Sequence, residues 1–176
     1  LCWALWKLRG QPFPWGRVHL LRGLGVTLLA MFTLFPLVFM AAEINREWAL
    51  ALEISTPHPL LEYLREPSTV PSKFAMVALG VCLAGPLAEE LLFRGLWQGA
   101  IERRLGVAAS LLLPSLLFAV VHPAETYLPM FVFALGLGLL MRLSSSILPC
   151  MLLHIMFNSL SVFDVSLYRF GFPWPV

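Results

Sequence analysis

The chain has 176 residues, of which 59% are hydrophobic and only 12% are charged. Soluble domains carry about a quarter charged residues, and one buried core cannot hide this much apolar surface. These values indicate a membrane protein and exclude a disordered chain. The formal net charge is +2, and the basic residues are spread along the chain instead of forming one face with aromatic residues. We therefore expect no nucleic-acid partner.

Uncharged stretches locate the membrane segments, because about 20 apolar residues cross a hydrocarbon core roughly 30 Å thick. The segments expected on this basis are 23–42, 74–104, 107–121, 126–141 and 144–163. The second is apolar as far as residue 88 and continues through the charged residues that follow, which places these charges in mid-helix. Three segments are short, which indicates a water-filled cavity. The sequence thus predicts an all-α, polytopic integral membrane bundle of about five segments in the lipid bilayer.

Charges outside the segments predict the orientation. The basic residues before the first segment are Lys7, Arg9, Arg17 and Arg22, with no acid among them. This favours a cytoplasmic N-terminus, with Arg103, Arg104 and Arg142 on the same side. The chain begins at Leu1 without an initiator Met, so the sequence leaves the true N-terminus open, and the first residues are expected to form an interfacial segment.

One domain is expected, because no internal repeat or low-complexity tract is present. Residues 1–73 would hold the interfacial segment, the first membrane helix and a loop. The prolines at 57, 59, 67 and 71 mark residues 43–73 as a loop after a short amphipathic helix. Residues 74–176 would form the helical core that carries the polar motifs.

The strongest local signal runs from Glu89 to Arg94, where three ionisable side chains interrupt an apolar helix. Each costs about 2.5 to 3.5 kcal/mol at the bilayer centre, so such charges are usually functional. Glu90 and Arg94 are four residues apart and can pair on one helix face. Glu89 is rotated by about 100° from Glu90 and has no neutralising neighbour in sequence, so it is the candidate general base. The alternative is a structural ion pair near a helix end.

Two histidines lie in otherwise apolar helices. With a turn at Gly106, His122 comes level with Glu89 in an antiparallel hairpin. His154 precedes Asn158 by four positions, and together the two side chains could hold a developing oxyanion in acyl-group hydrolysis. We expect His154 to reach that layer only with helix tilt or a recessed hairpin. A lone histidine of this kind is more often a hydrogen-bonded packing residue, but the combination with Glu89 favours a site.

Metal and serine mechanisms are the chemical alternatives. Glutamate and histidine are zinc ligands, but no H-E-x-x-H motif is present and asparagine is a poor zinc ligand, so we expect no metal. Ser115 and Ser159 lie near the histidines in sequence, but neither stands in a G-x-S-x-G context. No cofactor motif appears. The aromatic residues expected to face lipid or to pack are Phe131, Phe133, Phe157 and Phe163.

Three motifs occur together in order: E-E-x-x-x-R at 89–94, F-x-x-x-H at 118–122 and H-x-x-x-N at 154–158. As a set they resemble the CAAX protease and bacteriocin-processing family, also described as the Abi family. Its members are glutamic intramembrane endopeptidases related to the eukaryotic CAAX prenyl endopeptidase. The resemblance covers residues 74–165, whereas residues 1–73 match only as a preceding helix and loop.

The resemblance implies a role for each matched residue. Glu89 would be the base that activates water, and His122 would help to position or deprotonate that water. His154 and Asn158 would form the oxyanion site.

Glu90 and Arg94 are similar to the supporting pair of the family. The family uses no metal and no organic cofactor. Its fold is an all-helical bundle around a cavity open to one side.

The sequence therefore predicts an intramembrane endopeptidase that cleaves a peptide or a membrane-anchored protein by general-base attack of water, without an acyl-enzyme. The compact chain shows no extra helices that would shape a prenyl pocket. We therefore favour a bacterial peptide substrate, cut at a leader or a C-terminal tail, in the inner membrane. The alternatives are a non-proteolytic immunity or peptide-sequestering protein and a proton-coupled transporter that uses Glu89 and His122 as a relay. The sequence leaves the oligomeric state open.

Overall fold

The computed structural model describes residues 20–54, 62–64, 66 and 70–169. The expected interfacial segment at the N-terminus and most of the proline-rich loop lie outside these residues. Throughout the described part of the chain, every regular element is helical. The predicted all-α fold is confirmed.

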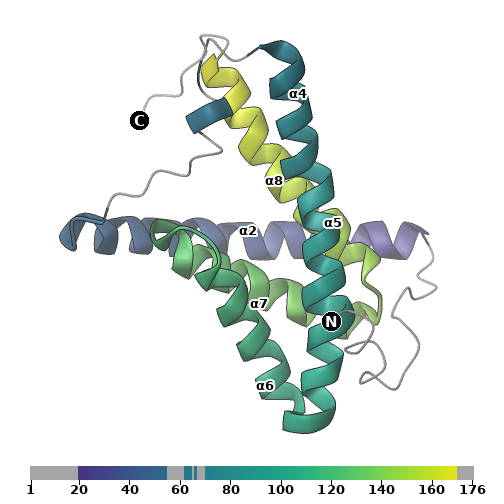
Figure 1. Ribbon diagram of the computed structural model, residues 1–176. Helices are drawn as coiled ribbons and strands as arrows, with labels where there is room; N and C mark the ends of the chain where they lie inside the picture. The colour runs from purple at the N-terminus through teal and green to yellow at the C-terminus, as the bar shows by residue number, and fades with distance from the viewer. Residues whose placement is uncertain (1–19, 55–61, 65, 67–69, 170–176) are drawn as a thin grey trace.

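The helices follow one another as shown in Figure 1: α2 (Leu20–Ala51), α4 (Pro71–Leu79), α5 (Gly85–Glu90), α6 (Gly99–Val120), α7 (Tyr127–Ser144) and α8 (Leu148–Arg169). Two π-helical segments flank α5, namely η1 (Gly80–Ala84) and η2 (Leu91–Gln98). A short 3-10 helix, η3 (Ala124–Thr126), precedes α7. From α4 to the first part of α6 the backbone winds without a break into one long rod (Figure 1).

The first membrane helix is longer than the sequence predicts. We expected it to end at Ala42 and to be followed by a separate amphipathic helix, but α2 continues to Ala51. No glycine or proline interrupts residues 43–51, and Arg46 pairs with Glu43 one turn earlier. Both features favour continued helix. The extension brings the end of α2 beside the start of α7.

A sharp turn at Gly106 divides α6 into two arms. The φ and ψ of Gly106 are 81° and −179°, a region that is essentially restricted to glycine. The predicted hairpin turn is therefore confirmed. Four helical stretches are long and apolar enough to cross a membrane, and Gly106 splits the longest of them, residues 71–120. The described chain thus forms five helical rods, as the sequence indicates.

The last two helices are displaced from their predicted bounds. We expected them over 126–141 and 144–163, whereas α7 ends at Ser144 and α8 begins at Leu148. Ser145 adopts a left-handed conformation with φ 53°, and the Ser144 hydroxyl donates to the Leu140 carbonyl. A left-handed residue directly after the last turn is a common C-cap, and the Ser145 N–H bonds the Met141 carbonyl, so α7 ends at Ser144.

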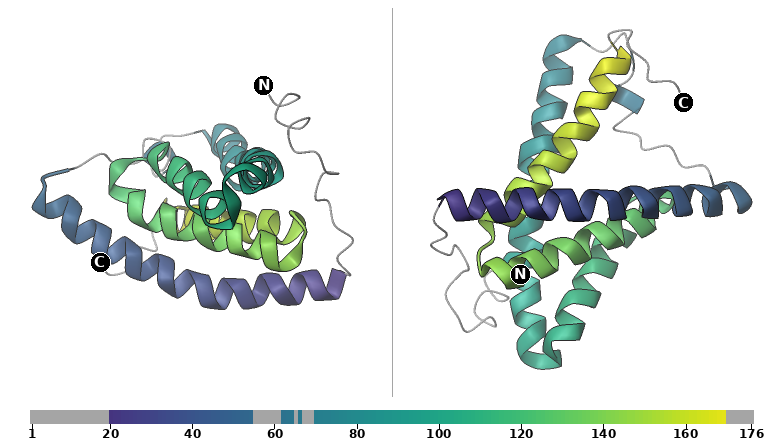
Figure 2. Two further views of the ribbon diagram at one scale, coloured as in Figure 1. Left: turned by 90° about the horizontal axis from the view of Figure 1, so that it is seen from below. Right: turned by 180° about the vertical axis from the view of Figure 1, so that it is seen from behind.

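The core lies where α2, η2, α6, α7 and α8 meet. Its buried members include Phe35, Phe93, Phe118, Phe133 and Leu153. Both views of Figure 2 show α2 lying along one side of the bundle with α7 beside it. This approach is close, because a Cβ atom at Gly136 of α7 would clash with the Leu34 side chain of α2. The core therefore joins the first helix to all the segments that carry the polar motifs.

Large apolar side chains also cover the outside of the helices. Phe32 and Phe39 of α2 are 74% and 66% exposed, and Val121 at the end of α6 is 71% exposed. An apolar surface of this kind on several helices at once is typical of helices that face lipid. Together with the four long apolar stretches, this surface makes the chain a multi-pass integral membrane protein.

We predict that Gly106→Ala destabilises the protein by about 1 to 3 kcal/mol, because an L side chain strains this backbone conformation. A Cβ atom at Gly106 meets nothing within 4 Å, so the loss would come from conformation and not from a clash. Thermal unfolding in detergent measures it. Gly25→Ala is the matched control, since Gly25 lies inside α2 in equally open space. Equal midpoints for the two variants would contradict the prediction.

Candidate active site

The two adjacent acids of α5 have opposite environments. They are the last two residues of α5, which lies between the π-helical segments η1 and η2. The Glu90 side chain is 0% exposed, whereas that of Glu89 is 37% exposed. The cause is their rotation of about 100° around the helix axis, which turns one carboxylate into the bundle and leaves the other partly exposed. A single dipeptide therefore supplies one buried and one accessible carboxylate.

Glu90 pairs with Arg94, as their spacing predicts. Arg94 Nη1 donates to Glu90 Oε1 at 2.9 Å, and both side chains are buried. The second guanidinium nitrogen, Nη2, donates to the Ala134 carbonyl of α7 at 2.9 Å. The guanidinium also lies over the Phe118 ring, 5.3 Å from its centroid. Arg94 thus fixes the buried acid and fastens the rod to α7.

The same face of η2 makes a second bond to α7. Gln98 Nε2 donates to the Gly138 carbonyl at 2.9 Å, four residues beyond the carbonyl that Arg94 reaches. The two bonds have the same sequence separation, so η2 and α7 run in the same direction with a fixed register. Gln98 is not among the site residues that the sequence predicted. The pattern that could have indicated it is its position four residues after Arg94, which continues the polar face of the motif.

His154 reaches both acids from α8. Its Nδ1 lies 2.9 Å from Glu90 Oε1, and its Nε2 lies 3.6 Å from Glu89 Oε2. A carboxylate only accepts, and Glu90 already accepts from Arg94, so Nδ1 of His154 carries the proton of this bond. The Phe133 ring meets the imidazole edge to face at 5.2 Å. Helix α8 therefore does come to the layer of the acids, with its imidazole held in one orientation.

His122 lies at the end of α6 and joins the group through an aromatic ring. Its Nδ1 donates to the Phe118 carbonyl at 2.6 Å, and its ring lies 4.6 Å from the Phe118 ring. Phe118 also meets His154 at 5.8 Å, so one buried phenyl ring contacts both imidazoles. The bond at Nδ1 leaves Nε2 as the basic atom of His122. In the described part of the chain, no ion pair or hydrogen bond joins His122 to Glu89 directly.

Asn158 lies one turn beyond His154 and faces the first π-helical segment. Its Nδ2 donates to the Val81 carbonyl of η1 at 2.9 Å. A π-helical turn displaces carbonyls from the usual hydrogen-bond ladder, so a side-chain donor can satisfy one of them. One amide hydrogen is used in this bond, and among the residues that the structure describes no partner is found for the second N–H or for the oxygen. The sequence predicted that Asn158 stabilises an oxyanion, but it did not predict the bond to the Val81 carbonyl.

The structure also places residues that the sequence analysis weighed for a serine mechanism, for lipid contact and for metal binding. The hydroxyl of Ser115 donates to the Leu111 carbonyl of its own helix. Phe133, expected to face lipid or to pack, is buried against His154, whereas Phe163 is exposed. Across the residues that the structure describes, no three His, Cys, Asp or Glu side chains are arranged to hold a metal ion.

We predict that Arg94→Met destabilises the protein by about 3 to 5 kcal/mol, because it leaves the Glu90 carboxylate buried without its counter-charge. Unfolding by a denaturing detergent in mixed micelles measures the loss. Arg46→Met is the control, since Arg46 also contacts two acids but is 60% exposed. This control should change stability by less than about 1 kcal/mol. A similar loss in both variants would show that burial does not set the strength of the Glu90–Arg94 pair.

A family of known proteins matches more than half of the chain. The model of the family described as Type II CAAX prenyl endopeptidase Rce1-like matches residues 71–160. The match includes the rod, both arms of α6, α7 and the first half of α8. The searches of curated proteins and of solved structures found no match.

Proposed function

Because the chain belongs to the Rce1-like family of type II CAAX prenyl endopeptidases, we propose that it is a glutamic-type intramembrane endopeptidase in which Glu89 activates the attacking water. The observation that carries this proposal is the unequal environment of the two acids. Glu90 is enclosed and bonded to Arg94 and His154, whereas Glu89 is accessible and faces Nε2 of His154. Neighbouring carboxylates in contrasting surroundings take different roles. Glu89 is the carboxylate that water and a peptide can reach.

The proposed reaction is a direct attack of water on a peptide carbonyl. Glu89 takes a proton from the water, and the resulting hydroxide adds to the carbonyl carbon. Nε2 of His122 is the second basic atom that can orient this water, because Nδ1 is held by the Phe118 carbonyl. The proton then passes to the leaving amine as the carbon–nitrogen bond breaks. No acyl-enzyme forms in this sequence of steps.

The negative oxygen of the intermediate would be stabilised from α8. Asn158 is held by Val81 and has a second N–H to donate. His154 can donate from Nε2 when both ring nitrogens carry protons, and the Glu90 carboxylate at Nδ1, together with the oxyanion itself, would balance the charge of the ring while Glu89 holds the proton of the water. Donors that are fixed before the reaction stabilise the transition state without reorganisation. Glu90 and Arg94 support this arrangement by holding the imidazole.

The substrate that we propose is a peptide or membrane-anchored protein, cut at a leader or a C-terminal tail. We place the chain in a bacterial inner membrane with a cytoplasmic N-terminus. The ion pair between Arg142 and Glu102 supports this orientation, because it brings the end of α7 to the end of the rod. The basic residues Arg103, Arg104 and Arg142 therefore gather at one end of the bundle, as the positive-inside rule requires.

We predict that Glu89→Gln lowers kcat by about 10² to 10⁴, the usual contribution of a general base. The assay uses purified protein in detergent and two quenched fluorescent peptides, one ending in a farnesylated CAAX sequence and one in an unmodified apolar tail. Glu43→Gln is the control, because Glu43 is exposed on α2 and its ion pair within the described residues is with Arg46 of the same helix. Equal cleavage by the wild type and Glu89→Gln, or cleavage of neither peptide, would contradict the proposal.

We predict that Asn158→Ala lowers kcat by about 10² to 10³ with little change in KM, as expected for an oxyanion donor. Loss of its bond to Val81 should also cost about 0.5 to 1.5 kcal/mol of stability, measured separately by thermal unfolding. Ser161→Ala is the control on the same helix, since the Ser161 hydroxyl bonds only the Phe157 carbonyl of its own helix. A stability loss with an unchanged kcat would restrict Asn158 to the structural anchor.

A further inference from the structure

The turn that carries His122 is short and connects two membrane helices. The backbone N–H of His122 donates to the Ala119 carbonyl at 3.0 Å, and that of Thr126 donates to the Pro123 carbonyl at 2.9 Å. The Thr126 hydroxyl is also used on the Pro123 carbonyl. Thr126 is the N-cap residue of α7 but makes no side-chain capping bond. The Tyr127 N–H bonds the Ala124 carbonyl within the turn, so the next N–H of α7, that of Leu128, needs an acceptor from outside the turn.

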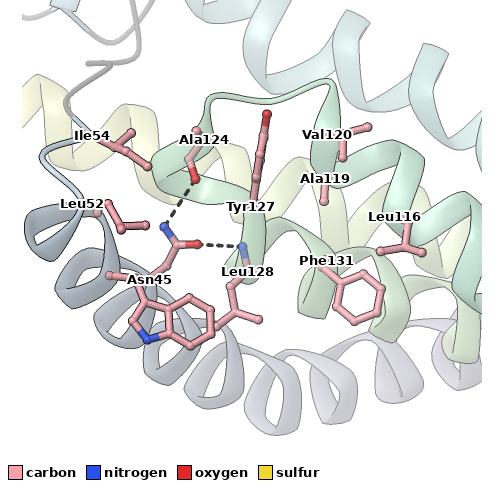
Figure 3. Close-up of a pocket in the computed structure, with 12 residues that line it drawn as sticks. Asn45, Leu52, Ile54, Leu116, Ala119, Val120, Ala124, Tyr127, Leu128 and Phe131 are labelled. Atoms are coloured by element: carbon pink, nitrogen blue, oxygen red, sulfur yellow. Dashed lines mark hydrogen bonds between the residues drawn. The ribbon is translucent and has the colours of Figure 1, made fainter.

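Asn45 of α2 supplies this acceptor (Figure 3). The backbone N–H of Leu128 donates to Asn45 Oδ1 at 2.9 Å, across 83 positions of sequence. On the other side of the amide, Asn45 Nδ2 donates to the Ala124 carbonyl at 3.5 Å. One side chain thus caps α7 and contacts η3 at the same time. It links α2 to the residues that follow His122 in the sequence.

The surroundings of Asn45 strengthen these bonds. The side chain is 6% exposed and borders a pocket of about 440 Å³ whose other walls include Trp48, Leu52 and Tyr127. In such apolar surroundings an amide that loses its partners is costly, and one that keeps them holds its geometry. Asn45 reaches the turn only because α2 continues past Ala42, where the sequence predicted the helix to end.

We propose that Asn45 is a positioning residue for the reaction, acting through the turn that carries His122. This inference rests on the proposed function. The ring of His122 is held by Phe118 on α6, and the chain that follows it is held by Asn45. Fixing both sides sets the direction in which Nε2 of His122 points. A displacement of about 1 Å in a reacting group can cost about 10²-fold in rate.

The test compares three variants in the peptide assay described above, with rates normalised to the folded, monodisperse fraction from size exclusion. Asn45→Ala removes both bonds and should lower kcat by about 10- to 10²-fold, with KM changed less than about threefold. Asn45→Asp keeps an oxygen for the Leu128 N–H and places negative charge at the N-terminus of α7, but it loses the donor to the Ala124 carbonyl, so it should restore part of the rate. Thr33→Ala, which removes a hydroxyl bonded only within α2, should behave as the wild type.

Hydrogen exchange of the α7 amide at Leu128 gives a readout that does not depend on cleavage. Its protection should fall in Asn45→Ala and return in Asn45→Asp. The inference is overturned if Asn45→Ala keeps the wild-type kcat while Glu89→Gln loses it, or if Asn45→Asp fails to restore either the rate or the protection. If the wild type and Glu89→Gln cleave equally, the proposed function fails, and the assignment of Asn45 to the reaction fails with it.

Discussion

One buried carboxylate oxygen, Glu90 Oε1, accepts from both Arg94 and His154. A charge buried without partners is expensive in an apolar bundle, so its two donors must arrive together when the helices pack. Arg94 comes from the same rod, whereas His154 comes from α8. Arg94 also bonds the Ala134 carbonyl of α7. The requirement to neutralise one carboxylate therefore brings three parts of the chain to one point.

The π-helical segments on either side of the acids determine which side chains and backbone carbonyls face α7 and α8. In η2, Arg94 and Gln98 face α7 and bond carbonyls that are themselves one turn apart. In η1, the Val81 carbonyl accepts from Asn158. Segments of π-helix change the direction of side chains and expose backbone acceptors, which is why they occur at functional positions. Here they align the rod with α7 on one side and with α8 on the other.

The first helix takes part in this arrangement although it carries none of the three motifs. Its residues Leu34, Phe35 and Val38 belong to the same buried cluster as Phe118 and Phe133. Through Asn45 it also holds the start of α7. Residues outside the matched range 71–160 thus support the geometry of those inside it.

Composition and local spacing determined several features of this protein by themselves. The apolar content required a membrane bundle, the four-residue spacing placed Arg94 on the face of Glu90, and Gly106 marked the hairpin. The apolar content is a property of the whole sequence, and the other two features depend on residues close in sequence, where helix geometry is fixed. Only the tertiary structure decided that His154 bonds Glu90, that Asn158 bonds Val81 and that Asn45 caps α7. These contacts join residues 64 to 83 positions apart, and helical periodicity carries no information about how separate rods cross and rotate.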